Sequence, residues 1–266
     1  MNKLLCILLF SVATGCASLE TTTQGTTTAS TEAPTINPRA FVIDKPSANG
    51  PHPTVIVGHG CDGLHSNVAL FYYAKVLNSW GYNAVFYDSF QSKGLSGGFI
   101  CQKPMRISPE YRAREAQEAA KWIKQQPWHT GKVGYLGISH GGATAIHIGM
   151  LSPKINEISA TVAMYPSCSW VVLGLPFQDP EGISNSRGYF IQTPTQLHLG
   201  SKDTWTPPYE CKKDMRNAEL YEYENASHAF DLNEPNRVMF GHGLGYDRNA
   251  TLESRERIKK FLLKNM

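Results

Sequence analysis

The stretch Gly137-Ile138-Ser139-His140-Gly141 limits what this chain can fold into more than any other. Residues 132–136 before it are β-branched and aromatic, as in a short buried strand, and residues 142–150 after it have the small side chains of a helix packed against a sheet. A serine in such a strand-to-helix turn has a strained backbone that projects its hydroxyl. The pattern therefore predicts that Ser139 is a nucleophile. An ordinary glycine-rich turn is the alternative interpretation.

Apolar runs and helix signals alternate along the rest of the chain. We expect strands at 54–57, 83–87, 132–136, 159–165, 195–199 and 219–223. We expect helices at 68–80, 108–126, 142–150, 208–217 and 249–265. This alternation predicts an α/β fold with a mostly parallel central sheet and helices on both faces. Sites in such sheets form at the carboxyl ends of the strands.

Two residues lie where the strand ends would bring them to Ser139. Asp203 follows the strand at 195–199, and His228 follows the strand at 219–223. A serine is a poor nucleophile without a histidine base and an acid that orients it, and the order Ser, Asp, His is that of a hydrolase triad. Asp88 and Asp179 also lie in loops and are alternative acids. The other histidines do not follow the carboxyl end of a predicted strand in the way that a base of this triad would. They are His52, His65, His129, His140, His147, His198 and His242.

Two backbone N–H groups are needed to bind the oxyanion that forms during acyl transfer. We expect one from His140, directly after the nucleophile at the start of its helix. We expect the other from Cys61, in the loop after Gly58-His59-Gly60.

The segment 166–194 is long, rich in Gly and Pro, and carries several large apolar side chains. A stretch of this length without a clear period is often a functional loop. We expect it to fold over the site, so that Trp170 and Phe177, with Trp205 nearby, line the substrate pocket. Packing of these side chains into the core is the alternative.

Six segments together resemble the dienelactone hydrolase family of the α/β hydrolases, over about residues 52–232. They are 57–61, 73–82, 137–142, 164–166, 200–207 and 227–231. The resemblance implies the α/β-hydrolase fold. We expect no cofactor, and no cluster of His, Cys or Asp in the sequence has metal-ligand spacing. Dienelactone hydrolases proper use a cysteine nucleophile, whereas position 139 is serine, which favours a serine esterase. We expect hydrolysis of a small-molecule carboxylic ester through an acyl-enzyme. A peptidase of similar fold and a non-catalytic binding protein on a hydrolase scaffold are the alternatives.

The N-terminus has the pattern of an export signal. Residues 1–16 combine Lys3, an apolar stretch too short to span a bilayer, and a lipobox-like Ala13-Thr14-Gly15-Cys16. We expect lipidation of Cys16 and a bacterial lipoprotein facing the periplasm or cell exterior, with plain secretion as the alternative. Residues 17–35 are rich in Thr and Ser and predict a disordered linker to the domain at 36–266. The net charge of +3 and the lack of a basic run argue against a nucleic-acid partner.

Four of the six cysteines, Cys61, Cys101, Cys168 and Cys211, lie in the predicted domain. Export permits disulfides, four cysteines pair in three ways, and four buried thiols are the alternative. Similar exported members of the family carry cysteines at the positions of Cys168 and Cys211, which implies that bridge. We also predict a Cys61–Cys101 bridge, which would tie the oxyanion loop to the glycine-rich loop at 89–107.

Overall fold

A seven-stranded sheet forms the centre of the computed structural model, which describes residues 36–38, 41–64, 68–169 and 189–266. The strand order is β1-β3-β2-β4-β5-β7-β9, and the ranges are β1 Val42–Asp44, β2 His52–Gly58, β3 Asn83–Phe86, β4 His129–Ile138, β5 Ala160–Met164, β7 Thr195–Gly200 and β9 Glu219–Tyr223. Only β1 is antiparallel to its neighbour among these strands. The mostly parallel sheet predicted from the sequence is confirmed.

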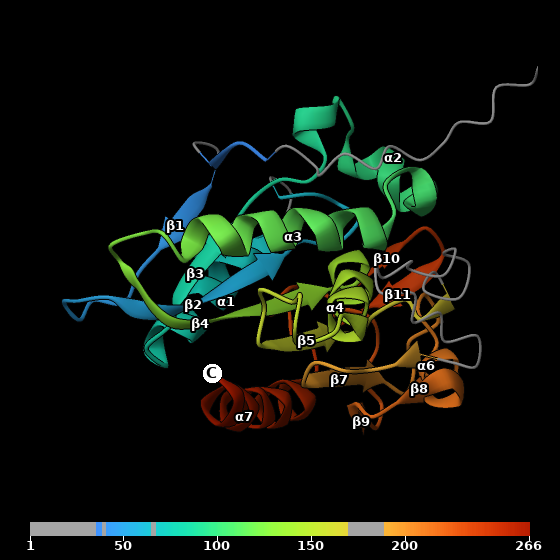
Figure 1. Cartoon of the computed structure of the whole chain (residues 1–266). Coiled ribbons are helices and arrows are strands. Elements are labelled where there is room, and N and C mark those ends of the chain that lie inside the picture. The colour runs from blue at the N-terminus through green and yellow to red at the C-terminus, as the bar shows by residue number, and fades with distance from the viewer. Residues whose placement is uncertain (1–35, 39–40, 65–67, 170–188) are drawn as a thin grey trace, which may run out of the picture. The chain divides into compact units, whose positions relative to one another are not determined.

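Helices cover both faces of this sheet (Figure 1). The main helices are α1 Val68–Ser79, α3 Pro109–Ile123, α4 His140–Met150, α6 Pro208–Asp214 and α7 Arg248–Asn265. α1 and α7 pack on one face through residues such as Leu77 and Phe261, and α3 and α4 pack on the other. Because both faces are covered, the central part of β4 is apolar without alternation.

The ends of two helices follow the capping rules. Ser108 caps α3, accepting a 3.1 Å hydrogen bond from the Tyr111 N–H, and Pro109 occupies the first helical position. Asp247 caps α7 in the same way through the Ala250 N–H, at 2.9 Å. The predicted helices at 108–126 and 249–265 are therefore found, with ends that differ from the prediction by at most three residues.

Several short elements lie outside the sequence predictions. The glycine-rich segment expected as a loop at 89–107 contains the 3₁₀ turns η2 Gln91–Lys93 and η3 Pro104–Arg106 and the short helix α2 Gly97–Gln102. Two small ribbons pair β6 Tyr189–Phe190 with β8 Met215–Arg216, and β10 Arg237–Met239 with β11 His242–Leu244. The β10–β11 hairpin matters most, because it lies at the site described below.

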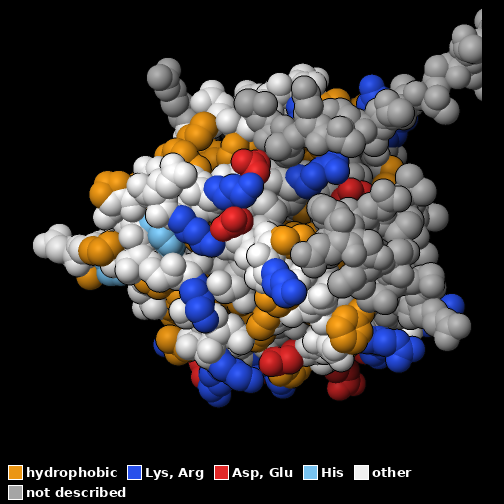
Figure 2. All heavy atoms as spheres, viewed as in Figure 1, with side chains coloured by type: hydrophobic (Ala, Val, Ile, Leu, Met, Phe, Trp, Pro, Cys, Tyr) orange, Lys and Arg blue, Asp and Glu red, His pale blue; other side chains and the backbone are white. Residues whose placement is uncertain are grey.

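Acidic and basic side chains are mixed on the face of the molecule that carries α3 (Figure 2). Pairs such as Lys121–Glu118 at 2.9 Å and Lys124–Glu157 at 2.8 Å contribute to this pattern. No helix in the described part of the chain has the length and apolar character to cross a bilayer. The predicted signal and linker at 1–35 lie outside the described residues.

Candidate active site

Ser139 occupies the sharp turn between β4 and α4, at the carboxyl edge of the sheet. Its φ of 53° and ψ of −113° lie in a region that non-glycine residues rarely adopt, and backbone strain of this kind collects at functional sites. Gly141 makes the turn possible: a Cβ there would lie 2.3 Å from the carbonyl oxygen of Gly58 on β2. The strand-turn-helix arrangement predicted from the sequence is therefore present.

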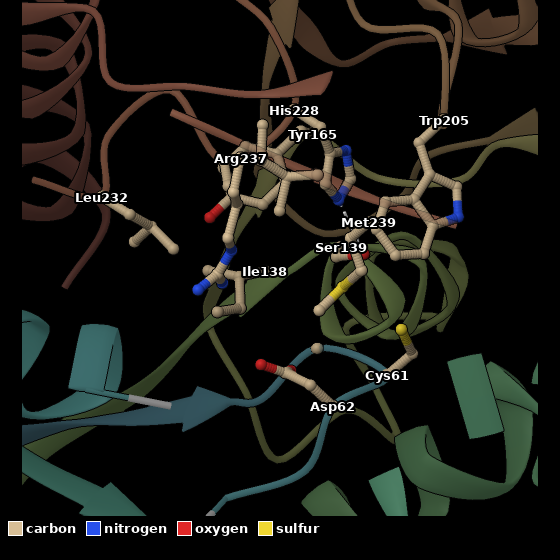
Figure 3. A pocket seen from close by; sticks show the side chains of 13 residues that line it. Cys61, Asp62, Ile138, Ser139, Tyr165, Trp205, His228, Leu232, Arg237 and Met239 are labelled. Carbon is tan, nitrogen blue, oxygen red and sulfur yellow. Dashed lines mark hydrogen bonds between the residues drawn. The ribbon is translucent and has the colours of Figure 1, made fainter. Parts of the chain in front are cut away.

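His228 and Asp203 complete a hydrogen-bonded chain with this serine. Figure 3 shows the His228 side chain beside Ser139. The His228 Nε2 atom lies 3.1 Å from the Ser139 Oγ, and the Nδ1 atom lies 2.7 Å from the Asp203 Oδ2. The carboxylate accepts a hydrogen bond from the Nδ1–H of His228, so that the lone pair of Nε2 faces the serine hydroxyl. This is the geometry that a general base needs.

The Asp203 carboxylate is held by the turn that follows β7. Its Oδ1 accepts hydrogen bonds from the backbone N–H groups of Trp205, at 2.8 Å, and Thr206, at 2.9 Å, and the Thr206 hydroxyl lies 2.7 Å from Oδ2. Burial opposes the charged form, but the hydrogen bonds and charge of His228 and the bonds from Thr206 outweigh it, so the pKa of Asp203 lies below its ordinary value. The carboxylate is therefore ionised at neutral pH.

The competing residues named from the sequence have other surroundings. Asp88 accepts hydrogen bonds from the backbone of Phe90 and Gln91, and Asp179 lies outside the described residues. His198 is bonded to Gln196 and Tyr223, and burial lowers its pKa to about 3. Burial also lowers the pKa of His147, to about 4. Of the remaining alternatives, His52 and His129 lie at the opposite ends of their strands, and His65 lies outside the described residues.

The two expected oxyanion donors flank the serine. His140 is the first residue of α4, where backbone N–H groups point out of the helix and the helix dipole favours negative charge. Cys61 lies in the turn after β2 and lines the same pocket as Ser139. Gly60, which precedes Cys61, also lies close to the serine, because a Cβ on Gly60 would lie 3.5 Å from the Ser139 Cβ.

Both predicted disulfides are confirmed, since Cys61 is bonded to Cys101 and Cys168 to Cys211.

A pocket with about 390 Å³ of space, part of it open to solvent, lies in front of the serine (Figure 3). Trp205 lines it, as predicted, with its ring 5.1 Å from that of His228. Trp170 and Phe177 lie outside the described residues, so their placement stays a prediction. Apolar side chains that the sequence analysis did not select form much of the rest of the wall: Ile138, Tyr165, Leu232, Met239 and Leu244.

The sequence of residues 39–266 matches the dienelactone hydrolase family. The chain belongs to this family. No curated protein matches the sequence. Among solved structures, the fold is similar to Est1E from Butyrivibrio proteoclasticus with bound ferulic acid, at 18% identity and a TM-score of 0.56 over 85% of this chain and 94% of that one. It is also similar to dienelactone hydrolase from Anabaena variabilis, at 19% identity and 0.57 over 85% and 91%. A third is a dienelactone hydrolase-like promiscuous phosphotriesterase from metagenomic libraries, at 20% identity and 0.58 over 85% and 99%.

The part of the pocket that sequence reasoning missed is the β10–β11 hairpin. It brings Arg237, Met239 and Leu244 to the pocket, and it brings His242 against Trp205, with ring centroids 5.4 Å apart and nearly parallel planes. In the sequence, the glycines at 241, 243 and 245 weakly resemble a nucleotide-binding motif but do not follow a predicted strand. The positive φ of Phe240 and Gly241 shows that the pattern is a hairpin turn.

Proposed function

We propose that this protein is a serine hydrolase that cleaves carboxylic esters through an acyl-enzyme on Ser139. The observation that carries the proposal is the hydrogen-bonded chain of Asp203, His228 and Ser139, with links of 2.7 and 3.1 Å. Membership of the dienelactone hydrolase family supports hydrolase chemistry. The serine in place of a cysteine favours esters over the family's namesake lactone.

The proposed reaction has two halves. His228 takes the proton from the Ser139 hydroxyl as its oxygen attacks the ester carbonyl, and the tetrahedral oxyanion is bound by the N–H groups of Cys61 and His140. The imidazolium then gives its proton to the leaving alcohol. Asp203 stabilises the imidazolium and keeps its ring oriented. Water, activated by the same histidine, releases the acyl group.

The pocket supports a small substrate. Its described walls are mostly apolar, with Trp205, Met239 and Leu244 close to the serine. An apolar pocket discriminates weakly, by about 1–3 kcal/mol per methylene. We therefore expect para-nitrophenyl esters of short acids to be preferred, with a gradual decline as the chain lengthens.

Labelling by a fluorophosphonate tests the proposal most directly. The wild-type protein should be labelled once, at Ser139, and Ser139→Ala should lose both labelling and ester turnover, by on the order of a million-fold in kcat as in a subtilisin-type triad. Ser254→Ala is a matched control, because Ser254 is also buried but lies on α7. A folded Ser139→Ala protein that keeps more than a few per cent of the turnover would refute the assignment. Absence of labelling in the wild type would favour a non-catalytic protein.

We also propose that the protein is exported and anchored by a lipid on Cys16, with residues 17–35 as a flexible tether. Two disulfides support an oxidising compartment, because such bonds are rare in the reducing cytosol. The lipobox-like pattern at 13–16 supports the anchor.

A further inference from the structure

Arg112 is a charged side chain in the core of the molecule. It lies on α3, next to Ala113, which packs on the sheet, and only 1% of its surface is exposed. Burying a cation is strongly unfavourable unless hydrogen bonds compensate for the lost water. The hydrogen bonds that compensate for the burial of this guanidinium therefore indicate its role.

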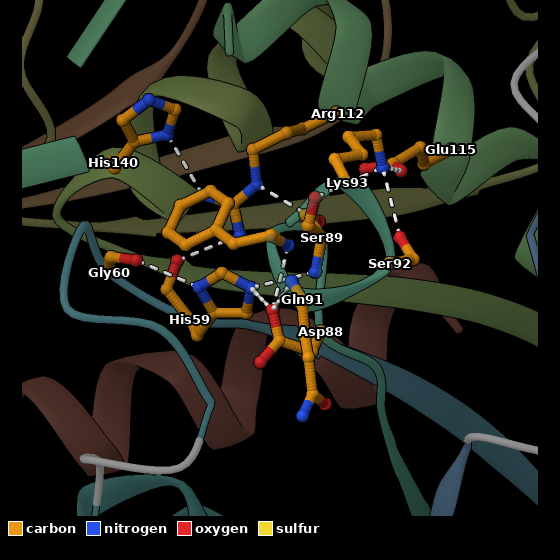
Figure 4. A network of polar contacts seen from close by, with 11 residues as sticks. His59, Gly60, Asp88, Ser89, Gln91, Ser92, Lys93, Arg112, Glu115 and His140 are labelled. Atoms are coloured by element: carbon orange, nitrogen blue, oxygen red, sulfur yellow. Dashed lines mark hydrogen bonds and ion pairs between the residues drawn. The ribbon is translucent and has the colours of Figure 1, made fainter. Parts of the chain in front are cut away.

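The guanidinium connects segments that are far apart in the sequence (Figure 4). One terminal nitrogen donates to the backbone carbonyl of His59 at 2.9 Å, and the other lies 2.8 Å from the Nδ1 atom of His140. Nε donates to the Ser89 hydroxyl at 3.3 Å, and the Phe90 ring lies 5.2 Å away. These acceptors are neutral groups. Glu115 interacts with Arg112 electrostatically, but its carboxylate is bonded to Lys93 at 2.6 Å.

His140 is fixed in one protonation state by this contact. Its Nε2 lies 3.0 Å from the backbone carbonyl of Pro104, which can only accept, so Nε2 carries the proton and Nδ1 accepts from Arg112. Burial and the positive charge of Arg112 lower the pKa of His140 to about 3. The imidazole is thus a neutral link between Arg112 on α3 and the backbone at Pro104.

Both ends of the guanidinium hold the elements that carry the proposed oxyanion donors. His140 itself supplies one N–H, and the His59 carbonyl lies two residues before Cys61, which supplies the other. The two elements are in direct contact, since a Cβ on Gly141 would lie 2.8 Å from the His59 carbonyl oxygen. The rigid, planar guanidinium of Arg112 therefore connects the two segments that carry the oxyanion donors, on their side away from the pocket.

We propose that Arg112 is a positioning residue for ester hydrolysis, which fixes the Cys61 and His140 N–H groups relative to each other and adds positive charge behind the developing oxyanion. This inference rests on the proposed esterase function. Arg112 does not line the pocket, so it acts through His59 and His140 without touching the substrate. Its loss should lower transition-state stabilisation and leave ground-state binding unchanged.

The first test compares Arg112→Met and Arg112→Lys with the wild type on a short para-nitrophenyl ester. We expect Arg112→Met to lower kcat on the order of 100-fold, as the loss of one oxyanion donor does, with little change in KM. Arg112→Lys keeps the charge but not the planar fork, so its kcat should be intermediate. Arg114→Met, two residues along α3 and paired with Glu110 on the surface, is the control and should keep the wild-type kcat.

A second readout separates oxyanion positioning from a general loss of structure. Sulfur accepts hydrogen bonds poorly, so the matched thionoester gains less from the oxyanion donors than the oxygen ester does. Arg112→Met should therefore reduce the ratio of ester to thionoester kcat/KM. Ile123→Ala is the control for stability, because Ile123 is fully buried further along the same helix and does not line the pocket. It should lower the melting temperature without changing this ratio.

Variants of His140 test the same bridge if Arg112→Met does not fold. His140→Asn and His140→Leu are similar in shape and keep the backbone N–H, but only Asn offers an acceptor to Arg112. We expect His140→Asn to retain more kcat and a higher ester-to-thionoester ratio than His140→Leu. A folded Arg112→Met protein with wild-type kcat and ratio would overturn the inference, as would equal, wild-type values for both His140 variants. If the wild type hydrolyses no ester and takes no fluorophosphonate, the proposed function fails and this inference fails with it.

Discussion

Removal of the Cys61–Cys101 disulfide by Cys101→Ala should lower activity more than its effect on stability explains. Cys61 carries a proposed oxyanion donor, and the bridge ties it to α2. The two segments are also packed tightly, since a Cβ on Gly97 would lie 1.8 Å from the backbone oxygen of Asp62. Replacing Cys101 leaves the Cys61 backbone intact, so the variant changes only what holds it.

The expected loss of stability follows from the sequence separation of 40 between the two cysteines. In the chain-entropy model a loop of that length contributes about 4 kcal/mol, which corresponds to a fall of about 10 °C in the melting temperature of a domain this size. A displaced oxyanion donor would lower kcat by up to about 100-fold. The two effects are measured separately, by thermal melting and by ester turnover well below the melting temperature.

Cys211→Ala is the matched control. It removes the other disulfide, whose 43-residue separation gives nearly the same entropic contribution, but neither Cys168 nor Cys211 carries an oxyanion donor. We expect similar losses of melting temperature in the two variants and a much larger loss of kcat in Cys101→Ala. Equal kcat values in the two variants would refute the reasoning, because the Arg112 bond to the His59 carbonyl would then be sufficient to hold the turn.

The remaining predictions concern the triad, the pocket and the N-terminus. Asp203→Asn should lower kcat by about four orders of magnitude, as a wrong histidine tautomer does in chymotrypsin-type triads, and an unchanged kcat would exclude Asp203 as the acid. Because the pKa of Asp203 is lowered on folding, its contribution to stability is complete above its unfolded pKa of about 3.9 and is lost as pH falls through the folded pKa. On acidification through this range, the melting temperature of the wild type should therefore fall more than that of Asp203→Asn. Trp205→Ala should change the acyl-chain preference of ester hydrolysis, and an unchanged preference would show that Trp205 does not contact the acyl group. Mass spectrometry of the mature protein should find a diacylated Cys16 at the N-terminus, and an unmodified N-terminus would indicate secretion.

The hydrogen-bonded arrangement of the proposed triad was predictable because each of its members follows a parallel strand. Ser139, Asp203 and His228 come after β4, β7 and β9, and parallel strands bring their carboxyl ends to one edge of the sheet. β4 ends in a buried apolar run and β7 is buried throughout, whereas β9 alternates large apolar side chains with two glutamates. The local sequence therefore indicated both the strand and the position of the candidate catalytic residue that follows it.

The hairpin that lines the pocket was not predictable in the same way. β10 and β11 are three residues each, too short for a periodic pattern, and Val238 and Phe240 remain exposed. The hairpin takes its place from contacts with distant segments, such as the ring of Trp205 against His242. The edge strand β1 was missed for the same reason, since three residues paired to β3 leave no recognisable signal.

Arg112 shows a further limit of sequence reasoning. The helix at 109–123 has an inner face of small apolar residues that includes Ala113, Ala116 and Ala120, and an arginine beside them is ordinarily expected to face solvent. Its burial depends on acceptors supplied by a backbone carbonyl at 59 and an imidazole at 140. No spacing within the helix encodes those partners, so only the assembled fold could show them.

The two halves of the site are held by different forces, and this has a measurable consequence. Asp203 is oriented mainly by the N–H groups of residues two and three positions further along the chain, which form a local turn. The oxyanion side depends on a disulfide and on a buried arginine that join segments separated by about 28 to 53 residues. A reductant should therefore damage the oxyanion side first and leave the pairing of His228 with Asp203 intact. We expect kcat to fall on reduction while the pH dependence of kcat/KM, which reports the histidine base, stays in place. A shift of that pH profile together with the loss of kcat would mean that the two halves are not independent.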